Sequence, residues 1–419
     1  MRHRKSEEMS RRDFARASAM AGFAVLTSCQ TRLRPAVETS SEILKVGLLG
    51  CGNRGTGAAV NMLEGDSNVK LIALADLFED RLKRSASQVK THKNPRVREK
   101  YAVDEDHCFV GFDAYEKILG TDIDILIEGT LPYCRPKHVE AAVKAKKHIF
   151  TEKPVASDPV GIRRFIAAAE RARELGLSLV AGTQRRHERP YVETIRKLHD
   201  GAIGEILSAR AYWCGGLPFV YDRESNWSDL EYQIRNWINY CWTAGDNIVE
   251  QHVHNLDVIN WVMNDHPVRV FASGGRTWKP REEKYGDLYD HFSCDFEYAN
   301  GVHMYSFSRH WNDVDGGVFE EVVGTRGRSN CKNMGERGKN PYVQEHIDLV
   351  KSILGTGPYL NEGVQVAEST LTAIMGRMSA YTGQRVTWDE AMQSDLSLVP
   401  EELSFDKVYP VGPIPSPGA

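Results

Sequence analysis

Residues 45–57, KVGLLGCGNRGTG, decide the fold of this chain. They are typical of an apolar strand that leads through a glycine-rich turn into a helix. Gly50, Gly52 and Gly55 have the G-x-G-x-x-G spacing that lets backbone N–H groups approach a pyrophosphate. Small residues suit the tight turn, the close phosphate approach and the packing of strand on helix. The stretch predicts a dinucleotide site, to which we also assign Asn53 and Arg54 of the same turn.

Short apolar segments alternate with helical patterns over residues 42–181, as expected for a parallel sheet. The expected strands are residues 44–49, 69–75, 123–128, 148–151 and 178–181. Asp76 follows the second strand, 21 positions after Gly55. An acid there accepts hydrogen bonds from an adenosine ribose and repels a 2′-phosphate, so NAD is favoured over NADP. Arg81, nearby in the sequence, weakens this preference.

A second motif, Thr151-Glu152-Lys153-Pro154, follows the fourth of these strands. Its lysine would lie where a nicotinamide ring is held, and could relay a proton during oxidation of an alcohol. Glu152 either contacts the cofactor or caps the next helix. The glycine turn, the downstream acid and this lysine together predict a nicotinamide-dependent enzyme.

The pattern changes after residue 181. Expected strands at 206–213, 268–275, 291–298, 302–309 and 319–323 indicate a mostly antiparallel open sheet, with a hairpin turn at Asn300-Gly301. Helices are expected at 247–263, on the face of that sheet, and near 343–354 and 364–382. We divide the chain into an export signal of twin-arginine/lipoprotein type (1–29), a linker (30–41), an NAD-binding Rossmann domain (42–181), a substrate and oligomerisation domain (182–395) and a proline-rich tail (396–419).

The helix expected at 247–263 carries candidate catalytic residues. Glu250, His254, Asp257 and Trp261 have the spacing i, i+4, i+7 and i+11, so they share one face. His254 can serve as acid or base because the reference pKa of histidine is about 6.5. Glu250 would orient His254 or hold a sugar hydroxyl. Asp257 and Trp261 are better explained as structural, and a metal pair with His252 lacks further ligands at useful spacing.

The glycine turn, Glu152-Lys153-Pro154 and the Glu250–Trp261 helix resemble the glucose–fructose oxidoreductase / inositol dehydrogenase / MocA family. The resemblance extends from about residue 43 to 388. It implies a Rossmann domain joined to an α/β domain, hydride transfer between a sugar or cyclitol carbinol and a nicotinamide cofactor, and a homo-oligomer, either dimer or tetramer. By family position it places Thr130 and Gln184 at the cofactor cleft and Arg186 at the cofactor or substrate.

The helix departs from the family pattern at two positions. Glu250 stands where the family usually has aspartate, and His252 replaces a common glycine, so substrate preference is not carried over. We assign His252 to the substrate site. Seven of the eight tryptophans lie between Trp213 and Trp311, which suits carbohydrate because aromatic faces stack on the C–H faces of pyranose rings. Trp213, Trp237 and Trp242 are the candidates for this contact.

Three functions remain open. One is an NAD-dependent oxidation of a ring hydroxyl, at C3, of a sugar or glycoside. Another is a redox-neutral glycosidase that oxidises C3, eliminates the aglycone, adds water and reduces the ketone again, with Glu250, His252 or a tyrosine as the base at C2. A remote third is a non-catalytic sugar-binding protein, against which the intact lysine, acid and histidine argue.

The chain has 419 residues and a formal net charge of −4, which gives no electrostatic reason to expect nucleic acid. Ser10-Arg11-Arg12-Asp13-Phe14, an apolar run and Leu26-Thr27-Ser28-Cys29 resemble a twin-arginine signal ending in a lipobox. The expectation is export to the periplasm or cell envelope, with membrane contact only through a lipid on Cys29; the alternative is a disordered basic tail. Eight cysteines without a CxxC pair predict neither a disulfide framework nor a structural metal.

Overall fold

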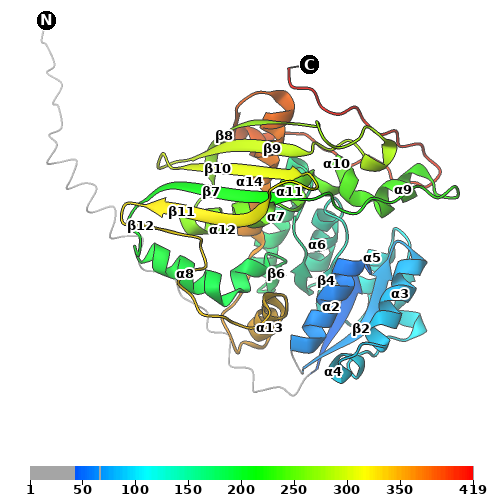
Figure 1. Ribbon diagram of the computed structural model, residues 1–419. Coiled ribbons are helices and arrows are strands. Elements are labelled where there is room, and N and C mark those ends of the chain that lie inside the picture. The colour runs from blue at the N-terminus through cyan, green and yellow to red at the C-terminus, as the bar shows by residue number, and fades with distance from the viewer. Residues whose placement is uncertain (1–42, 66–67, 419) are drawn as a thin grey trace, which may run out of the picture. The chain divides into compact units, whose positions relative to one another are not determined.

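The computed structural model describes residues 43–65 and 68–418 (Figure 1). The predicted export signal, with Cys29, and the predicted linker lie outside the described residues. Within the described part, no helix is long and apolar enough to cross a membrane.

The first sheet has six parallel strands in the order β3-β2-β1-β4-β5-β6. The strands predicted at 44–49 and 148–151 are confirmed, and the others differ by two residues or fewer at one end. β3 was not predicted because its three residues are partly exposed and form no buried apolar run, whereas β6, equally short, is fully buried. The strands are β1 (Leu44–Leu49), β2 (Val69–Asp76), β3 (Cys108–Val110), β4 (Ile125–Glu128), β5 (His148–Thr151) and β6 (Leu179–Ala181).

Helices connect most of these strands, since parallel neighbours need a long crossover between them. Strand order reverses between β1 and β4, so the carboxyl ends of the strands open a crevice there. α7 begins at a proline, and its N-cap Asp158 accepts a hydrogen bond of 2.7 Å from the N–H of Gly161. The connecting helices are α2 (Asn53–Gly65), α3 (Glu79–Lys90), α4 (Pro95–Arg98), α5 (Ala114–Leu119), α6 (Arg135–Lys144) and α7 (Pro159–Glu174).

The second sheet has seven strands in the order β12-β11-β7-β10-β9-β8-β13. Every neighbouring pair is antiparallel except β7 and β10, so the predicted, mostly antiparallel sheet is confirmed. Gly301, at φ +80°, makes the predicted turn between β9 and β10. The strands are β7 (Ile206–Gly215), β8 (Pro267–Gly275), β9 (His291–Tyr298), β10 (His303–His310), β11 (Gly317–Gly324), β12 (Gly327–Ser329) and β13 (Val386–Thr387).

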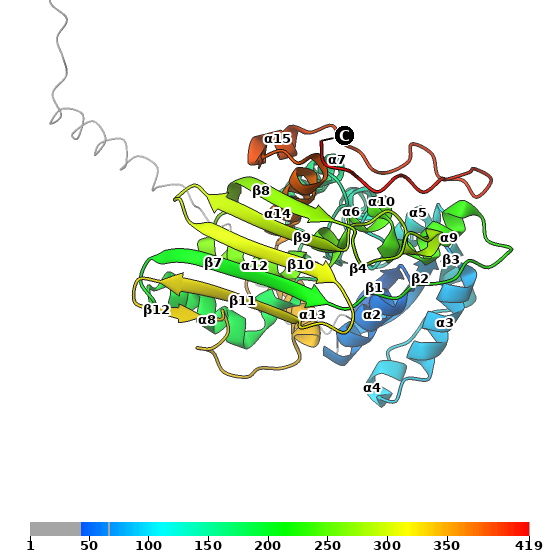
Figure 2. The same ribbon diagram turned by 45° about the horizontal axis from the view of Figure 1, so that its top comes forward.

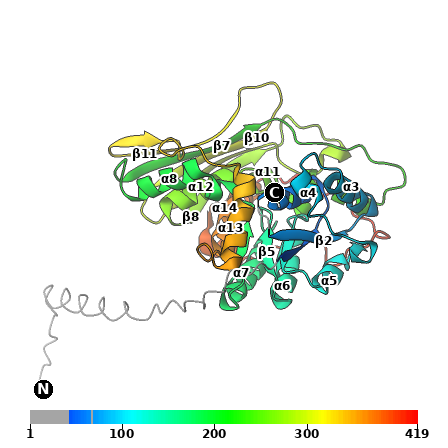
Figure 3. The same ribbon diagram turned by 90° about the horizontal axis from the view of Figure 1, so that it is seen from below.

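Helices cover one face of this second sheet and leave the other open. α8 (Arg189–His199), α12 (Val253–Met263) and α14 (Gly363–Thr382) lie on the covered face (Figures 2 and 3). α13 (Pro341–Leu354), although late in the sequence, packs against α2 of the first sheet. Strand residues alternate between the two faces. The open face therefore carries the aromatic residues that alternate with the core, namely Tyr212, Phe271, Tyr305, Phe307 and Phe319.

The single helix predicted over 247–263 is wrong, because two helices occupy this range. α11 (Asn247–Glu250) ends before α12 begins at Val253. At the break, the N–H of His252 donates to the carbonyl of Asn247 over 3.2 Å, five residues back instead of four. Other short helices are α9 (Asp229–Arg235), α10 (Cys241–Ala244) and α15 (Trp388–Gln393).

Buried His187, in the segment that follows β6, contacts both α13 and the start of α14. His187 Nδ1 lies 2.8 Å from Asp348 Oδ2 of α13, and its Nε2 lies 3.2 Å from Glu362 Oε1 at the start of α14. Burial alone lowers the pKa of His187. The charge of Glu362 and the hydrogen bonds to Asp348 and Glu362 outweigh burial and raise this pKa to about 10.

This histidine makes the free energy of unfolding depend on pH. Between the unfolded pKa of about 6.5 and the folded pKa of about 10, the folded state holds one proton more than the unfolded state. The His187 contribution is therefore complete below that window and is lost through it, at up to about 1.4 kcal/mol per pH unit. Urea unfolding of the wild type from pH 6 to 10 should show this fall. His187→Gln should flatten it, and equal slopes in both proteins would contradict the assignment.

Candidate active site

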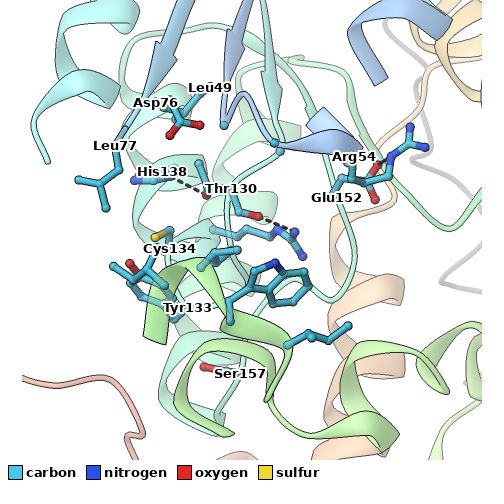
Figure 4. A pocket seen from close by; sticks show the side chains of 18 of the residues that line it. Leu49, Arg54, Asp76, Leu77, Thr130, Tyr133, Cys134, His138, Glu152 and Ser157 are labelled. Atoms are coloured by element: carbon cyan, nitrogen blue, oxygen red, sulfur yellow. Dashed lines mark hydrogen bonds and ion pairs between the residues drawn. The ribbon is translucent and has the colours of Figure 1, made fainter. Parts of the chain in front are cut away.

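A cleft of about 1150 Å³ opens at the carboxyl ends of the first sheet. One wall comes from the turns after β1, β2, β4 and β5. The facing wall comes from β7, α11 and α12, and the C-terminal segment closes one side. In Figure 4, Asp76 and Leu77 lie apart from the Arg54–Glu152 pair, with Thr130 and His138 between them. A crevice at this position is where open α/β sheets bind their ligands.

The glycine turn fits the phosphates of a dinucleotide. Gly50 has φ +93°, and a Cβ there would lie 2.6 Å from the backbone of Gly129 and Thr130. A Cβ on Gly55 would lie 1.9 Å from the carbonyl oxygen of Gly50, so Gly55 serves the packing of α2 on β1 and does not itself line the cleft. Gly52, Asn53 and Arg54 do line it. The backbone is thus exposed to the cleft at the start of a helix, as phosphate binding requires.

Asp76 ends β2 at the mouth of this turn and is positioned by two backbone groups. Its Oδ2 accepts the N–H of Cys51 at 2.6 Å, and its Oδ1 accepts the N–H of Phe78 at 2.8 Å. Burial raises the pKa of Asp76, against the lowering effect of these hydrogen bonds. Each carboxylate oxygen retains a lone pair. Asp76 lines the cleft and can therefore accept hydrogen bonds from ribose hydroxyls.

A buried polar group at the end of β4 was missed by the sequence analysis. Thr151 donates its hydroxyl to Glu128 at 3.1 Å, His138 Nδ1 lies 3.2 Å from the same carboxylate, and Thr130 also donates to it. Burial opposes the charge of Glu128, but the His138 bond and the Arg135 charge keep its pKa below the usual range. The group fixes the backbone of Thr130, which lines the cleft. The only sequence signal was a charged residue ending an apolar strand.

Glu152 and Lys153 leave β5 in opposite directions. Glu152 is paired with Arg54, whose Nε lies 2.7 Å from Glu152 Oε1 (Figure 4), and the Arg54 guanidinium lies 5.0 Å from the ring centroid of Tyr342. This pair joins the glycine turn to the lysine motif. Asp158, and not Glu152, caps the next helix, α7, so the expected capping role is wrong and cofactor contact stays a prediction.

Lys153 reaches across the cleft to the second domain. Its Nζ donates to Glu250 Oε1 at 2.8 Å and also to the backbone carbonyl of Glu250. The side chains are 13% and 11% exposed, so the pair is largely shielded from water but remains open to the cleft. α11 presents Glu250 because its N-cap, Asp246, accepts the N–H of Asn247 at 2.6 Å. Once the lysine has passed a proton to the carboxylate, its amine can take up the proton of a bound hydroxyl.

His254 lies on the same wall, with its ring centroid 6.0 Å from that of Trp213. Burial, followed by the positive charges of Lys153, Arg185 and Arg54, holds its pKa well below the usual range. His254 is therefore neutral at neutral pH, which corrects the expectation of a histidine titrating near 6.5. Its Nδ1 is buried without a hydrogen-bond partner. A neutral imidazole with an unused nitrogen can form a hydrogen bond with a bound hydroxyl, whereas the lowered pKa disfavours full proton uptake.

An aromatic segment forms the outer end of the cleft. Residues 216–228, which contain no helix or strand, carry Phe219 and Tyr221 into it, and Trp237 lies 6.3 Å from Phe219 between ring centroids. Trp213 and Trp237, two of the three predicted tryptophans, line the cleft. Trp242 does not, because its Nε1 donates to Gln233 at 2.7 Å and its ring packs against Tyr133.

Three other predicted site residues lie outside the cleft. His252 is fully buried, and its Nε2 lies 2.7 Å from the hydroxyl of Ser306 beneath the second sheet. Arg186 makes a bidentate pair with Asp257, with Nε–Oδ2 2.9 Å and Nη2–Oδ1 2.8 Å. Gln184 belongs to a short 3₁₀ segment and has a buried amide oxygen. The assignments of His252 and Arg186 to substrate and of Gln184 to cofactor are thus not supported by their positions.

The structural interpretation of Asp257 and Trp261 agrees with their contacts. Asp257 also accepts the hydroxyl of Ser369 from α14 at 2.8 Å, and the Arg186 guanidinium lies 5.2 Å from the Trp261 ring. Among residues 43–65 and 68–418, no cluster of three or more His, Cys, Asp or Glu could hold a metal ion. The cysteines in that part of the chain are free thiols.

Comparisons with known proteins agree with this geometry. Residues 44–179 match the model of an oxidoreductase family with an NAD-binding Rossmann fold, and residues 191–329 match the GFO/IDH/MocA C-terminal domain. Myo-inositol 2-dehydrogenase of Thermotoga maritima is 25% identical over 245 residues, or 58% of this chain and 62% of that protein. The 2,7-anhydro-N-acetylneuraminate hydratase of Escherichia coli is 27% identical over 157 residues, or 36% of this chain and 37% of that protein. The chain thus aligns with less than two thirds of each.

Solved structures share the fold. Aldose-aldose oxidoreductase from Caulobacter crescentus superposes with a TM-score of 0.64 at 18% identity, covering 83% of this chain and 100% of that one. The Lactobacillus casei scyllo-inositol dehydrogenase with bound NAD(H) and scyllo-inositol gives 0.62 at 16% identity, covering 83% and 99%. The glycine turn, the lysine at the cleft and both domain matches lead to one assignment: the chain belongs to the Gfo/Idh/MocA family of oxidoreductases, whose N-terminal domain binds NAD.

Proposed function

We propose that the protein is an NAD-dependent oxidoreductase that oxidises a ring hydroxyl, at C3, of a sugar or glycoside. The observation that carries the proposal is the contact of Lys153 with Glu250 in a cleft that also exposes His254. Trp213, beside His254, and Trp237, at the outer end of the same cleft, supply aromatic faces, which favours a pyranose ring. NAD is favoured over NADP because Asp76 would repel a 2′-phosphate.

The residues divide the proton chemistry among them. Bound NAD would accept the hydride from the carbinol carbon. Lys153 contacts the substrate hydroxyl and relays its proton, and Glu250 holds the lysine side chain across the cleft. The lowered pKa of His254 disfavours proton uptake, so the relayed proton passes to Glu250 or to solvent, while the unused nitrogen of His254 can bind a neighbouring hydroxyl. Loss of one hydride and one proton converts the alcohol to a ketone.

A redox-neutral glycosidase is the second candidate. It is favoured by the similarity to a relative named as a hydratase, whose name describes addition of water. In this reaction the ketone at C3 acidifies the C2 proton, the aglycone leaves, water adds, and the hydride returns from the cofactor. The base at C2 would be Glu250 or a tyrosine lining the cleft, such as Tyr221 or Tyr133. His252 is too deeply buried for that role. NAD bound tightly between turnovers would suit either candidate.

Replacing the central lysine tests whether the protein is an enzyme of this kind. Lys153→Met should lower kcat by about 10²–10⁴-fold, because the proton relay is lost while the phosphate turn is untouched. NAD content, measured on the denatured protein, should match the wild type. A variant with unchanged turnover would contradict the mechanism. Absence of activity in the wild type as well would favour the non-catalytic, sugar-binding alternative.

A panel of aryl glycosides separates the two enzymatic candidates. Aglycone release and absorbance at 340 nm would be followed together in the purified protein. We expect a lasting or acceptor-dependent NADH signal with the glycosidic bond intact. Aglycone release without lasting NADH would instead assign the redox-neutral route. Lys153→Met serves as the control for both signals, since each route begins with the same oxidation.

We also propose export by the twin-arginine route, with a lipid on Cys29, from the motifs at Ser10–Phe14 and Leu26–Cys29. Export would place the enzyme in the periplasm or cell envelope, separated from the free NAD pool. That separation favours a cofactor that stays bound.

We further propose a homo-oligomer, a dimer or tetramer, formed through the open face of the second sheet. Phe271, Tyr305, Phe307 and Phe319 on this face are 52%, 45%, 38% and 42% exposed, and an exposed apolar patch of this kind marks an interaction surface. Tyr212 and Phe319 stack at 4.5 Å between ring centroids, which makes the patch continuous across β7 and β11.

A charge on this face should break the assembly. Phe307→Glu should reduce the mass measured by light scattering to that of a monomer, because pairing would bury the new carboxylate. Val408→Glu, at a position that is 80% exposed on a different segment, is the matched control. The proposal is wrong if Phe307→Glu keeps the wild-type mass, or if the wild type is a monomer.

A further inference from the structure

The chain after α15 runs beside the cofactor cleft. Ser397 and the residues Val399, Pro400, Glu401, Glu402 and Leu403 line it. The red segment passes α10 and reaches the side of α9 in two views (Figures 1 and 2). We call residues 397–409 the C-terminal strap. None of the site residues inferred from the sequence belongs to it.

The strap begins at a firm anchor on the first domain. The N–H of Leu398 donates to Asp158 Oδ2 at 2.8 Å, while Oδ1 of the same carboxylate caps α7 through Gly161. Asp158 is only 3% exposed, so this contact is shielded from water. One buried carboxylate therefore fixes both the start of a helix and the start of the strap.

The strap ends at a second anchor, on α9 of the second domain. The N–H of Tyr409 donates to Asp229 Oδ2 at 3.0 Å, and its carbonyl accepts Gln233 Nε2 at 2.6 Å. The Tyr409 hydroxyl donates to the carbonyl of Glu402 at 2.8 Å and accepts the N–H of Ser404 at 2.9 Å. These bonds close residues 402–409 into a loop of defined shape.

Between the anchors, the strap contacts the end of the cleft marked by Asp76. The ring centroid of Phe405 lies 6.1 Å from that of Phe78, two residues after Asp76, and 5.1 Å from that of Phe112, which follows β3. Leu403 packs in the same apolar cluster as Phe78. An acid at the end of β2 is the ribose position of a Rossmann site, so these contacts lie at the adenosine end.

A second set of contacts joins α9 to the first domain at the same end of the cleft. Arg235 of α9 lies 4.0 Å from the centroid of the Phe78 ring and pairs with Asp80 of α3 at 2.9 and 3.1 Å. The Phe405 contact is the looser of the two, since Phe405 and Phe112 are 37% and 42% exposed. Separation of the strap at Phe405 therefore parts two partly exposed rings, Phe405 and Phe112, and also uncovers Phe78, which is 8% exposed while the strap is closed.

We propose that the C-terminal strap is part of the cofactor site and retains the bound dinucleotide by closing its adenosine end. The inference rests on the NAD dependence proposed above. Dissociation then requires Phe405 to leave Phe78 and Phe112, so the strap sets the rate of cofactor exchange. Oxidation and re-reduction of the same nicotinamide can follow each other while the strap stays closed.

Cofactor exchange, measured without any sugar, tests this. Full-length protein is loaded with NADH, an excess of NAD is added, and the decay of NADH fluorescence gives the dissociation rate. Phe405→Ala should accelerate dissociation about tenfold, the order expected when aromatic contacts worth roughly 1.4 kcal/mol are lost. Phe405→Tyr should restore the wild-type rate, and Val408→Ala, in the same strap but 80% exposed, should leave it unchanged.

The outcomes separate this inference from the proposed function. Faster release from Phe405→Ala alone, with an unchanged melting temperature, supports the strap. Equal rates in all four proteins would overturn the strap while leaving NAD-dependent oxidation intact. Equal acceleration by Val408→Ala would also overturn it, since the effect would not depend on the aromatic contact. Failure of the wild type to bind NADH at all would overturn both.

Discussion

The contact between Lys153 and Glu250 is the constraint on which the site depends, because it joins two domains built on different sheets. For an ion pair this shielded from water, the free-energy cost of desolvation can exceed the gain from the attraction between the two charges. The surrounding structure must therefore hold the two side chains in position. β5 and the Arg54–Glu152 pair fix one end, and Asp246 fixes the other by capping α11. The glycine turn, Lys153 and His254 then face the same cleft.

Much of the fold could be predicted from the sequence because its strands are apolar and its turns carry glycine. β1, β5 and β9 were predicted to the residue, and β1 and β5 end directly before Gly50 and Glu152, which mark their limits in the sequence. The break between α11 and α12 could not be predicted. Residues 247–263 keep a helical pattern throughout, and the contact of His252 with Ser306 of a distant strand, at the break, leaves no mark in that local pattern. β3, with three partly exposed residues, gives no buried apolar run.

The cofactor half of the site was more predictable than the substrate half. Gly50, Gly52, Asp76 and Lys153 are placed by local turn chemistry and by strand ends, which a motif records. Arg186 and Asp257 are 71 residues apart in the sequence. Because Arg186 pairs with Asp257, it stabilises the fold and is not placed to bind substrate, as the sequence had suggested. The partners of Glu128, of Trp242 and of the C-terminal strap are likewise set by the folded structure, and the sequence motifs do not identify them.

The aromatic segment 216–228 has a consequence for the diversification of such enzymes. It leaves β7 after the last ladder position and contains no strand that must keep register with a neighbour. Loops held by a rigid scaffold tolerate replacement better than the elements they connect. Phe219 and Tyr221 can thus be exchanged by insertion or deletion while the lysine and the glycine turn keep their places. In this architecture, changes in the loop that lines the cleft can therefore occur independently of changes in the residues that hold the cofactor and the proton relay.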